Sequence, residues 1–231
     1  MILAQLQLHD RASGKASCVE RNGFCPDWIA DNWERYKTPL LQHIELTLIS
    51  VAIGFVIAFS LALIAYRRKW LIAPITQVTG ILYTLPSVAL FFLLLPLTGR
   101  GKTTAIIALV AYTLLIIFRN VITGLEGVPP EARDAGRGMG LTPNQLLWKV
   151  ELPLALPAIM AGLRIAVTTT VGLTALVFLA GAGGLGEAIF SDTQFQSNVV
   201  VAGGLCVLLA VVCDLVVLGA QKLLTPWTRT A

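Results

Sequence analysis

The sequence predicts an all-α integral membrane protein with five transmembrane helices, an N-terminal amphipathic helix at the membrane interface and a helical element on the cytoplasmic side. Hydrophobic residues make up 56% of the 231 residues and charged residues only 13%, about half the charged share of a typical soluble domain. The hydrophobic residues form long continuous blocks instead of periodic stripes. No block alternates with the period of two that a spanning strand requires, so the spans are predicted to be helices.

The polar segment of residues 1–42 precedes the first apolar block. Its opening residues lack the basic region and the long apolar run of a secretory signal peptide. Residues 27–42 carry aromatic and apolar side chains at helical spacing, which predicts an amphipathic helix in the headgroup region; a loose extracytoplasmic tail is the alternative. These side chains belong to Trp28, Ile29, Trp33 and Tyr36.

The four cysteines fall into two pairs with different surroundings. Cys18 and Cys25 lie in the polar N-terminal segment, where a disulfide and two free thiols both remain open. Cys206 and Cys213 lie inside an apolar block and are interpreted as packing residues. The two histidines are isolated from each other and from the cysteines, so the sequence predicts no metal site.

Five apolar blocks predict five spans, because ~20 helical residues cross a hydrocarbon core of ~30 Å. The second block contains two prolines, Pro86 and Pro96. The blocks cover residues 44–65, 75–97, 104–122, 157–180 and 199–220.

Basic residues beside the spans orient the chain by the positive-inside rule. Nine Lys and Arg residues fall on one side of the predicted membrane, whereas the short loops on the other side hold only Arg100 and Lys102. The N-terminus is therefore expected outside and the C-terminus inside. The nine residues are Arg67, Arg68, Lys69, Arg119, Arg133, Arg137, Lys149, Lys222 and Arg229. A net charge of +4 is too modest to indicate a nucleic-acid partner.

The longest cytoplasmic segment, residues 124–151, lies between the third and fourth spans. The Pro129–Pro130 pair breaks the chain, and Glu131 suits the N-terminus of a helix. Gly140 belongs to a turn, and Thr142 caps a second short helix. This pattern predicts a helix-turn-helix that lies along the membrane and binds a recess on a cytoplasmic partner.

This segment resembles a motif of permease subunits of ATP-binding-cassette importers: Glu-Ala-Ala, three residues, Gly, nine residues, Ile, one residue, Leu-Pro. Every spacing is kept here, and Asp for Glu, Gly for Ala and Val for Ile preserve charge sign, small size and apolar character. The resemblance implies that the coupling loop, residues 124–153, carries a coupling helix on which a partner ATPase docks. The implied docking residues are Glu131, Asp134, Ala135, Gly136, Gly140, Val150, Leu152 and Pro153.

The wider chain, from residue 28 to residue 220, is similar to small permeases for osmoprotectants such as glycine betaine, carnitine, choline and proline. The similarity includes QHIELTLISVAIG from Gln42, YTLPSVALFFLL from Tyr83, and AGAGGLGEAIF from Ala180. It implies a pair of permease subunits, identical or homologous, around a central pathway, with an ATPase dimer below and an extracytoplasmic substrate-binding protein above. It also implies that the chain lies in the cytoplasmic membrane, is not an enzyme and holds no cofactor, since the partner binds ATP.

The resemblance divides the chain into an extracytoplasmic tail with its interfacial helix (residues 1–42), a transmembrane permease domain (43–220) and a cytoplasmic tail (221–231). Two alternatives remain open. One is the permease of a methionine-type or other small-solute importer, and the other is an ion-coupled secondary carrier. A carrier explains charged residues within spans but not the docking loop, and five spans without an internal repeat are few for that class.

A glycine-rich sequence follows the fourth span and fits the spacing of a dinucleotide-binding loop, but no strand precedes it. A broken helix end that serves as a gating loop and a plain re-entrant turn are the two interpretations. The glycines concerned are Gly181, Gly183, Gly184 and Gly186.

Within the spans, aromatic and charged residues are candidates for function. Tyr83, Phe92 and Tyr112 are candidates to line the pathway, because aromatic faces bind quaternary ammonium groups; packing or lipid contact explains them as well. Charges at membrane depth are costly and usually face protein or water. Arg164 and Asp214 are therefore hypothesised to pair.

Overall fold

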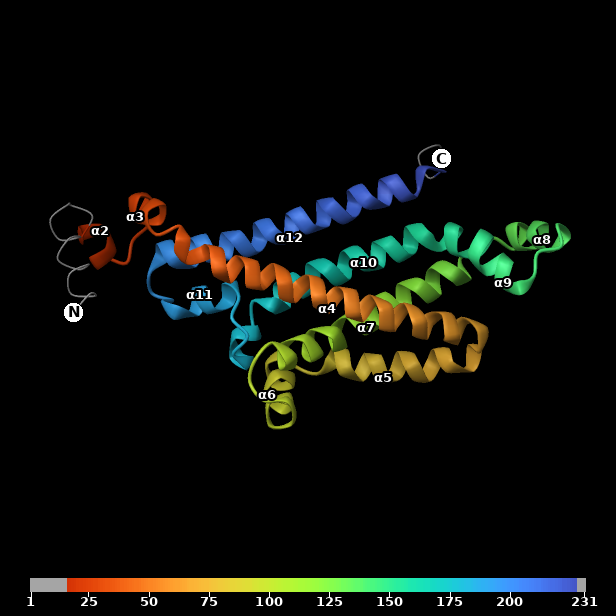
Figure 1. The fold of residues 1–231 in the computed structure, drawn as a ribbon, viewed down its shortest axis with the longest axis horizontal. Helices are drawn as coiled ribbons and strands as arrows, with labels where there is room; N and C mark the ends of the chain where they lie inside the picture. The colour runs from red at the N-terminus through yellow and green to blue at the C-terminus, as the bar shows by residue number, and fades with distance from the viewer. Residues whose placement is uncertain (1–15, 228–231) are drawn as a thin grey trace.

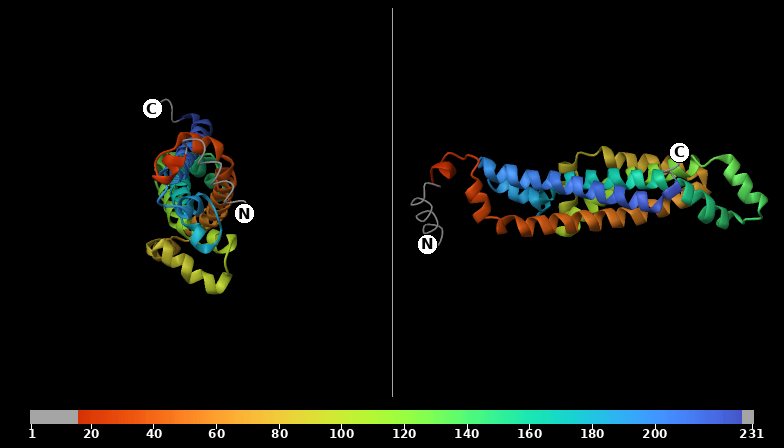
Figure 2. Two further views of the ribbon diagram at one scale, coloured as in Figure 1. Left: turned by 90° about the vertical axis from the view of Figure 1, so that its left-hand side faces the viewer. Right: turned by 90° about the horizontal axis from the view of Figure 1, so that it is seen from above.

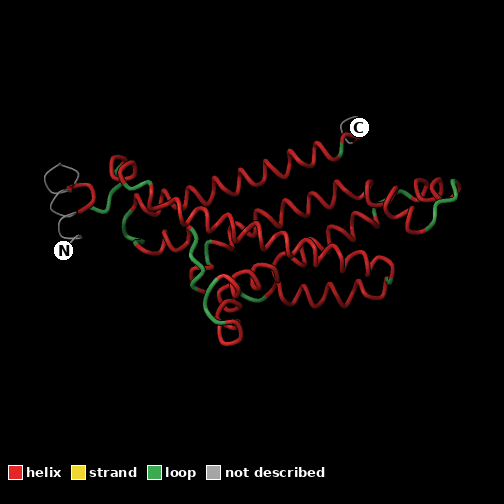
Figure 3. The backbone as a smooth tube through the Cα atoms, viewed as in Figure 1, coloured by secondary structure: helices red, strands yellow, loops and turns green. Residues whose placement is uncertain are grey.

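The computed structural model describes residues 16–227, in which every regular element is a helix. The helices form an elongated bundle, with the first helices at one end and α8 and α9 at the other (Figures 1 and 2). Most connections between helices are short (Figure 3). The outer parts of both predicted tails, including Arg229, lie outside the described residues. The elements are α2 (Ala16–Glu20), α3 (Pro26–Asp31), α4 (Glu34–Arg67), the 3-10 turn η1 (Lys69–Leu71), α5 (Ile72–Thr84), α6 (Ser87–Thr98), α7 (Lys102–Glu126), α8 (Pro130–Gly138), α9 (Pro143–Leu146), the π-helical turn η2 (Leu147–Glu151), α10 (Leu152–Thr174), the 3-10 turn η3 (Val177–Ala180), α11 (Leu185–Ser191) and α12 (Gln196–Leu224).

Four helical stretches in residues 16–227 are individually long and apolar enough to cross a membrane: α4, α7, the continuous α9–α10 unit and α12. The bent pair of α5 and α6 makes a fifth crossing if it is counted as one span. These stretches coincide with the five predicted apolar blocks. The predicted all-α membrane fold is therefore confirmed, and the number of spans depends on how the bent pair crosses.

The second predicted span is a broken helix. The segments on either side of Leu85 and Pro86 meet at 98°. Leu85 is extended, with ψ of 134°, which is the conformation favoured before a proline. Proline has no amide hydrogen with which to continue the ladder. On the inner side of the bend, the Tyr112 hydroxyl of α7 donates a hydrogen bond to the Leu85 carbonyl.

The N-terminal helices pack against the start of α12 instead of forming one interfacial helix. The predicted helix over residues 27–42 is divided between α3 and the first turns of α4, which is 34 residues long. Trp28 packs edge-on against Phe195, with 4.7 Å between ring centroids. Tyr36 is fully buried, and its hydroxyl donates to Asn198 Oδ1 at 3.1 Å. The first turns of α4 are helical because α12 covers the side of the helix that carries Tyr36.

A disulfide joins Cys18 to Cys25, with 6.0 Å between their Cα atoms, which resolves the alternative left open by the sequence. The small loop that it closes sits on α12. The Cys25 amide donates to Ser197 Oγ at 2.6 Å, and Ser197 Oγ donates to the Gly23 carbonyl at 2.9 Å. One buried serine thereby satisfies two backbone groups of the disulfide loop.

The main core lies where α4, α7 and α10 meet. Ala58 and Ala62 lie one turn apart on α4 and are buried in one cluster with Phe118 of α7. Small residues allow helix backbones in a membrane to approach closely. Helices α4 and α7 approach closely at Gly54, where a Cβ atom would lie 1.9 Å from Thr113 Oγ1.

The last helix is the least embedded. In Figure 1, α12 diverges from α4 toward its C-terminal end. It continues past residue 221, where the cytoplasmic tail was predicted to begin, and ends at Leu224. Its outward face is apolar and suited to lipid or to another membrane subunit; it includes Val207, Leu208, Val211, Leu215 and Val216.

Candidate functional site

The coupling loop folds as the helix-turn-helix that the sequence predicts. Helix α8 begins at Pro130, in the first helical position, directly after Pro129. Helix α9 begins with a capping box, in which Thr142 Oγ1 accepts from the Gln145 amide and Gln145 Oε1 accepts from the Thr142 amide. Both helix starts are thus specified locally, by proline and by a reciprocal cap.

No loop separates α9 from the fourth span. The π-helical turn η2 continues directly into α10, and Pro153 is the second residue of α10. The span begins earlier than the predicted residue 157, and α10 ends at Thr174 instead of residue 180. The second helix of the coupling loop is therefore a rigid extension of the span.

Each motif glycine has a physical reason to be small or flexible. Gly136 is buried, and a Cβ atom there would lie 2.5 Å from Leu146 Cδ1. Gly140 has φ of +76°, in the left-handed region that favours glycine. Gly138 differs from both, because nothing lies within 4 Å of its Cβ position and its φ is not positive.

The predicted docking residues fall on two sides of the coupling loop. Glu131, Asp134 and Ala135 are exposed on α8 and point away from the core. The residues at the far end of the motif are half-buried or buried where η2 joins α10: Val150, Leu152 and Pro153. The exposed α8 side is available to a partner, whereas the other residues attach the loop to the span.

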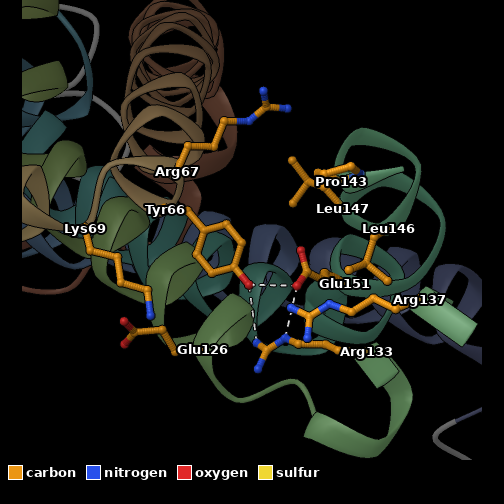
Figure 4. A pocket seen from close by; sticks show the side chains of 10 residues that line it. All are labelled: Tyr66, Arg67, Lys69, Glu126, Arg133, Arg137, Pro143, Leu146, Leu147 and Glu151. Atoms are coloured by element: carbon orange, nitrogen blue, oxygen red, sulfur yellow. Dashed lines mark hydrogen bonds and ion pairs between the residues drawn. The ribbon is translucent and has the colours of Figure 1, made fainter. Parts of the chain in front are cut away.

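A charged network, which the sequence analysis missed, attaches α8 to the spans. Arg133 Nε donates to Glu151 Oε1 at 3.0 Å, and the Tyr66 hydroxyl donates to the same oxygen at 2.9 Å (Figure 4). Arg133 Nη2 also donates to the Leu125 carbonyl at 2.6 Å. Glu151 is buried, so these bonds compensate a charge that would be costly alone. The available signal was a carboxylate in the one-residue gap of the motif.

This network forms one wall of a cavity of about 570 Å³ between α8 and the end of α4 (Figure 4). The other walls come from η1, the end of α7, and α9 with η2. The lining residues are Tyr66, Arg67, Lys69, Glu126, Arg133, Arg137, Pro143, Leu146, Leu147 and Glu151.

The glycine-rich sequence forms a turn between η3 and α11, which is compatible with both interpretations of it. Gly181, Gly183 and Gly184 all have positive φ, between +75° and +88°, which no helix accommodates. The Gly184 amide donates to Gln42 Oε1 at 3.1 Å. A Cβ atom on Gly183 would lie 2.3 Å from the same oxygen. Helix α4 therefore holds this loop closely in its present shape.

His43, beside Gln42 on α4, is a second contact to the glycine-rich loop. Its Nε2 lies 2.9 Å from the Val171 carbonyl, and its Nδ1 lies 3.4 Å from the Leu185 amide. A carbonyl only accepts and an amide only donates, so Nε2 carries the proton and Nδ1 accepts. The fully buried ring is thus a neutral bridge between α4, α10 and α11.

The three aromatic pathway candidates do not form one group. Tyr83 and Tyr112 are in edge contact, with 6.0 Å between centroids, at the bend of the second span. Tyr112 is buried, whereas Tyr83 is exposed. Phe92 is exposed on α6, and among the described residues no ring contact joins it to either tyrosine.

Arg164 and Asp214 form the hypothesised pair. Arg164 Nε and Nη2 donate to the two carboxylate oxygens of Asp214 at 2.8 and 2.7 Å. This two-point geometry is the strongest form of a guanidinium–carboxylate contact. It joins α10 to α12 within the apolar spans.

Comparison with known proteins gives consistent results. Residues 50–230 match the family model described as binding-protein-dependent transport system inner membrane component. The choline transport system permease protein OpuBB of Bacillus subtilis is 39% identical over 193 residues, which are 83% of this chain and 88% of that protein. The osmoprotectant import permease protein OsmW of Salmonella typhimurium is 37% identical over 206 residues, 86% of this chain and 96% of that protein. A solved inward-facing structure of the MetNI methionine ABC transporter matches with a TM-score of 0.67 and 26% identity, over 79% of this chain and 94% of that one.

Proposed function

The chain belongs to the family of binding-protein-dependent transport system inner membrane components, and we propose that it forms the translocation pathway of an ATP-binding-cassette importer for a small osmoprotectant. Glycine betaine, choline, carnitine or proline would be the solute. Relatives named for choline and osmoprotectant import match over most of both chains, which supports this class. The relative named for methionine is less similar in sequence, so a methionine-type importer is the second candidate.

The observation that carries the proposal is the rigid attachment of the coupling loop. Helix α9 continues through η2 into α10 without a break, and Arg133 fixes α8 to Glu151 and to the end of α7. A partner that moves α8 would therefore move a whole span. The exposed carboxylates Glu131 and Asp134 offer that partner a polar surface. On this proposal the ATPase dimer binds and hydrolyses ATP, and the permease transmits the motion.

The proposed orientation puts the N-terminus outside and the C-terminus inside the inner membrane. The Cys18–Cys25 disulfide supports an oxidising, extracytoplasmic location for that end. Arg67 and Lys69, at the opposite end of α4, support a cytoplasmic location by the positive-inside rule. The substrate-binding protein would then dock at the disulfide end, and the ATPases at α8.

We further propose that two permease subunits, identical or homologous, enclose the pathway. The apolar outward face of α12 supports a neighbour within the membrane. The glycine-rich loop would act as the outer gate, because Gln42 and His43 hold it by a few hydrogen bonds. Tyr83 and Tyr112 would line the pathway beside the bend.

Substitutions in the coupling loop test the proposal. Gly140→Leu forces a branched side chain into the left-handed region, which costs roughly 1–2 kcal/mol, and Asp134→Lys reverses an exposed charge. We expect either variant to insert normally but to lose ATPase co-purification and ATP-driven solute uptake in vesicles. Gly138→Ala is the matched control, since its Cβ position is open.

Two results would contradict the proposal. Normal co-purification of the ATPase with both Gly140→Leu and Asp134→Lys would show that the coupling loop is not the docking site. Accumulation of solute by the purified chain on an ion gradient alone would replace the importer with a secondary carrier. Binding of labelled glycine betaine, choline and methionine to the cognate substrate-binding protein separates the two importer classes.

A further inference from the structure

The cavity beside the coupling loop carries an excess of positive charge. Four of its lining residues are cationic and two are acidic. Glu151 is already engaged by Arg133 and Tyr66, so Glu126 is the acidic group left to offset the other cations. Arg137 contacts Asp134 at 3.3 Å, but both side chains are well exposed, and such pairs are weak.

Arg67 and Lys69 are the cations least neutralised in this cavity. Within residues 16–227 neither takes part in an ion pair. Arg67 donates a hydrogen bond to Asn144 Oδ1, a neutral acceptor. Figure 4 shows these two residues on the α4 side of the cavity and Arg137 on the opposite side. A group that binds between them would meet positive charge on both sides.

The cavity lies at the depth of lipid headgroups. Arg67 is the last residue of α4, one of the membrane-spanning stretches. Trp70, in the turn that follows, is 71% exposed, and Trp148 is 59% exposed. Exposed tryptophans beside the end of a span are typical of the membrane–water interface. A ligand in this cavity would therefore sit among the headgroups.

An apolar groove of about 520 Å³ lies on a neighbouring side of the same helical turn. Leu147 and Glu151 line the cavity, whereas Trp148 and Leu152, each one residue further along, line the groove. Successive residues of a helical turn point in different directions, so the cavity and the groove lie on adjacent faces of this turn. The rest of the groove is formed by Phe55, Phe59, Pro153, Leu156, Ile159, Met160 and Trp227.

We propose that this cavity and groove form a binding site for an anionic phospholipid. The phosphate-bearing headgroup would bind Arg67 and Lys69, and an acyl chain would lie in the groove against Trp148. Basic pockets between membrane helices bind such headgroups, and guanidinium groups match phosphate oxygens in two-point contacts. A bound lipid would connect the end of α4 to the coupling loop. The side of the membrane rests on the proposed orientation, but the site itself does not.

Native mass spectrometry of the purified full chain, with partner subunits where they co-purify, tests the headgroup site. Phosphatidylglycerol and phosphatidylcholine with identical acyl chains are the probes. We expect selective retention of phosphatidylglycerol by the wild type, and roughly thirtyfold weaker binding in the Arg67→Gln/Lys69→Gln variant. Arg68→Gln is the matched control, because Arg68 carries the same charge at the same depth but does not line the cavity.

A second measurement needs no charge variant. Phosphatidylglycerol with brominated acyl chains, added to the detergent-solubilised protein, should quench the fluorescence of the wild type more than that of Trp148→Phe, and brominated phosphatidylcholine should distinguish the two proteins less. Three results would overturn the proposal: equal retention of the two lipids, equal losses in Arg68→Gln and the double variant, or no difference in quenching. Displacement of the lipid by millimolar inorganic phosphate or glycerol 3-phosphate would identify a free-phosphate site instead.

Discussion

Gly186 lies so close to the backbone at Ala175 that no residue with a side chain fits in its place. A Cβ atom there would lie 1.7 Å from the carbonyl oxygen of Ala175, and close-packed backbone atoms cannot shift as a flexible side chain does. We expect Gly186→Ala to destabilise the fold by about 3 kcal/mol, measured as a lower thermal unfolding midpoint in detergent. Gly172→Ala is the control, since nothing lies within 4 Å of its Cβ position. Equal midpoints for both variants would refute the tight contact.

The Arg164–Asp214 pair makes a different kind of prediction. Asp214→Asn leaves the Arg164 guanidinium without charge compensation inside an apolar span. We expect a lower unfolding midpoint and weaker assembly with the proposed second permease subunit. The Arg164→Gln/Asp214→Asn variant leaves no lone charge and should recover most of this loss. If Asp214→Asn assembles and transports normally, the pair has no role.

Residue pairings of this kind are only partly readable from the sequence. Arg164 and Asp214 are charged residues in apolar blocks, so few partners are available to either and their pairing was expected. Arg133 and Glu151 are 18 residues apart in a polar loop with many charged neighbours. The carboxylate in the one-residue gap of the motif marks Glu151 as unusual, but only the folded positions of α8 and η2 select Arg133 as its partner.

At the scale of elements, Ser197 connects the disulfide loop to α12. Its hydroxyl accepts from the Cys25 amide and donates to the Gly23 carbonyl, and the residue is fully buried. Ser197→Ala leaves both groups without that partner, at a cost of about 1–3 kcal/mol. We expect dithiothreitol to reduce the Cys18–Cys25 bond faster in this variant than in the wild type. The rate is measured by alkylating the released thiols and counting them by mass spectrometry.

The matched control for Ser197→Ala is Ser60→Ala. The Ser60 hydroxyl is exposed and bonds only within its own helix, to the Val56 carbonyl. Its loss should leave the reduction rate unchanged. If Ser197→Ala also reduces at the wild-type rate, the disulfide loop does not depend on α12.

The helix ends in the structure agree with the predicted ones where burial in lipid determines them. They differ from the predicted ones where tertiary packing determines them. Long apolar blocks identify the spans, and Pro86 marks the bend in the second one, although its angle of 98° depends on α7. The polar first turns of α4 are helical because Tyr36 is covered by Asn198 of α12. A contact across 162 residues has no local signature, so the predicted interfacial helix was assigned different ends.

At the scale of the whole molecule, the disulfide and the coupling loop lie at opposite ends of the bundle (Figure 1). The proposed orientation can be tested with a single introduced thiol. Gly138→Cys occupies an open position on α8, and Ser in place of Cys206 and Cys213 removes the thiols of α12. We expect a membrane-impermeant maleimide to label residue 138 only in inside-out vesicles. Labelling of residue 138 in intact cells would show that α8 lies outside, opposite to the proposed orientation.

The 98° break between α5 and α6 gives the second span an elbow. A straight helix changes its angle only by giving up ladder hydrogen bonds, and in lipid each unpaired backbone group is costly. Here Pro86 has already ended the ladder, and the Leu85 carbonyl is bound by the Tyr112 hydroxyl instead. Rotation about this joint would leave both helical ladders intact. The two arms are thus joined by a hinge instead of by a continuous ladder of hydrogen bonds.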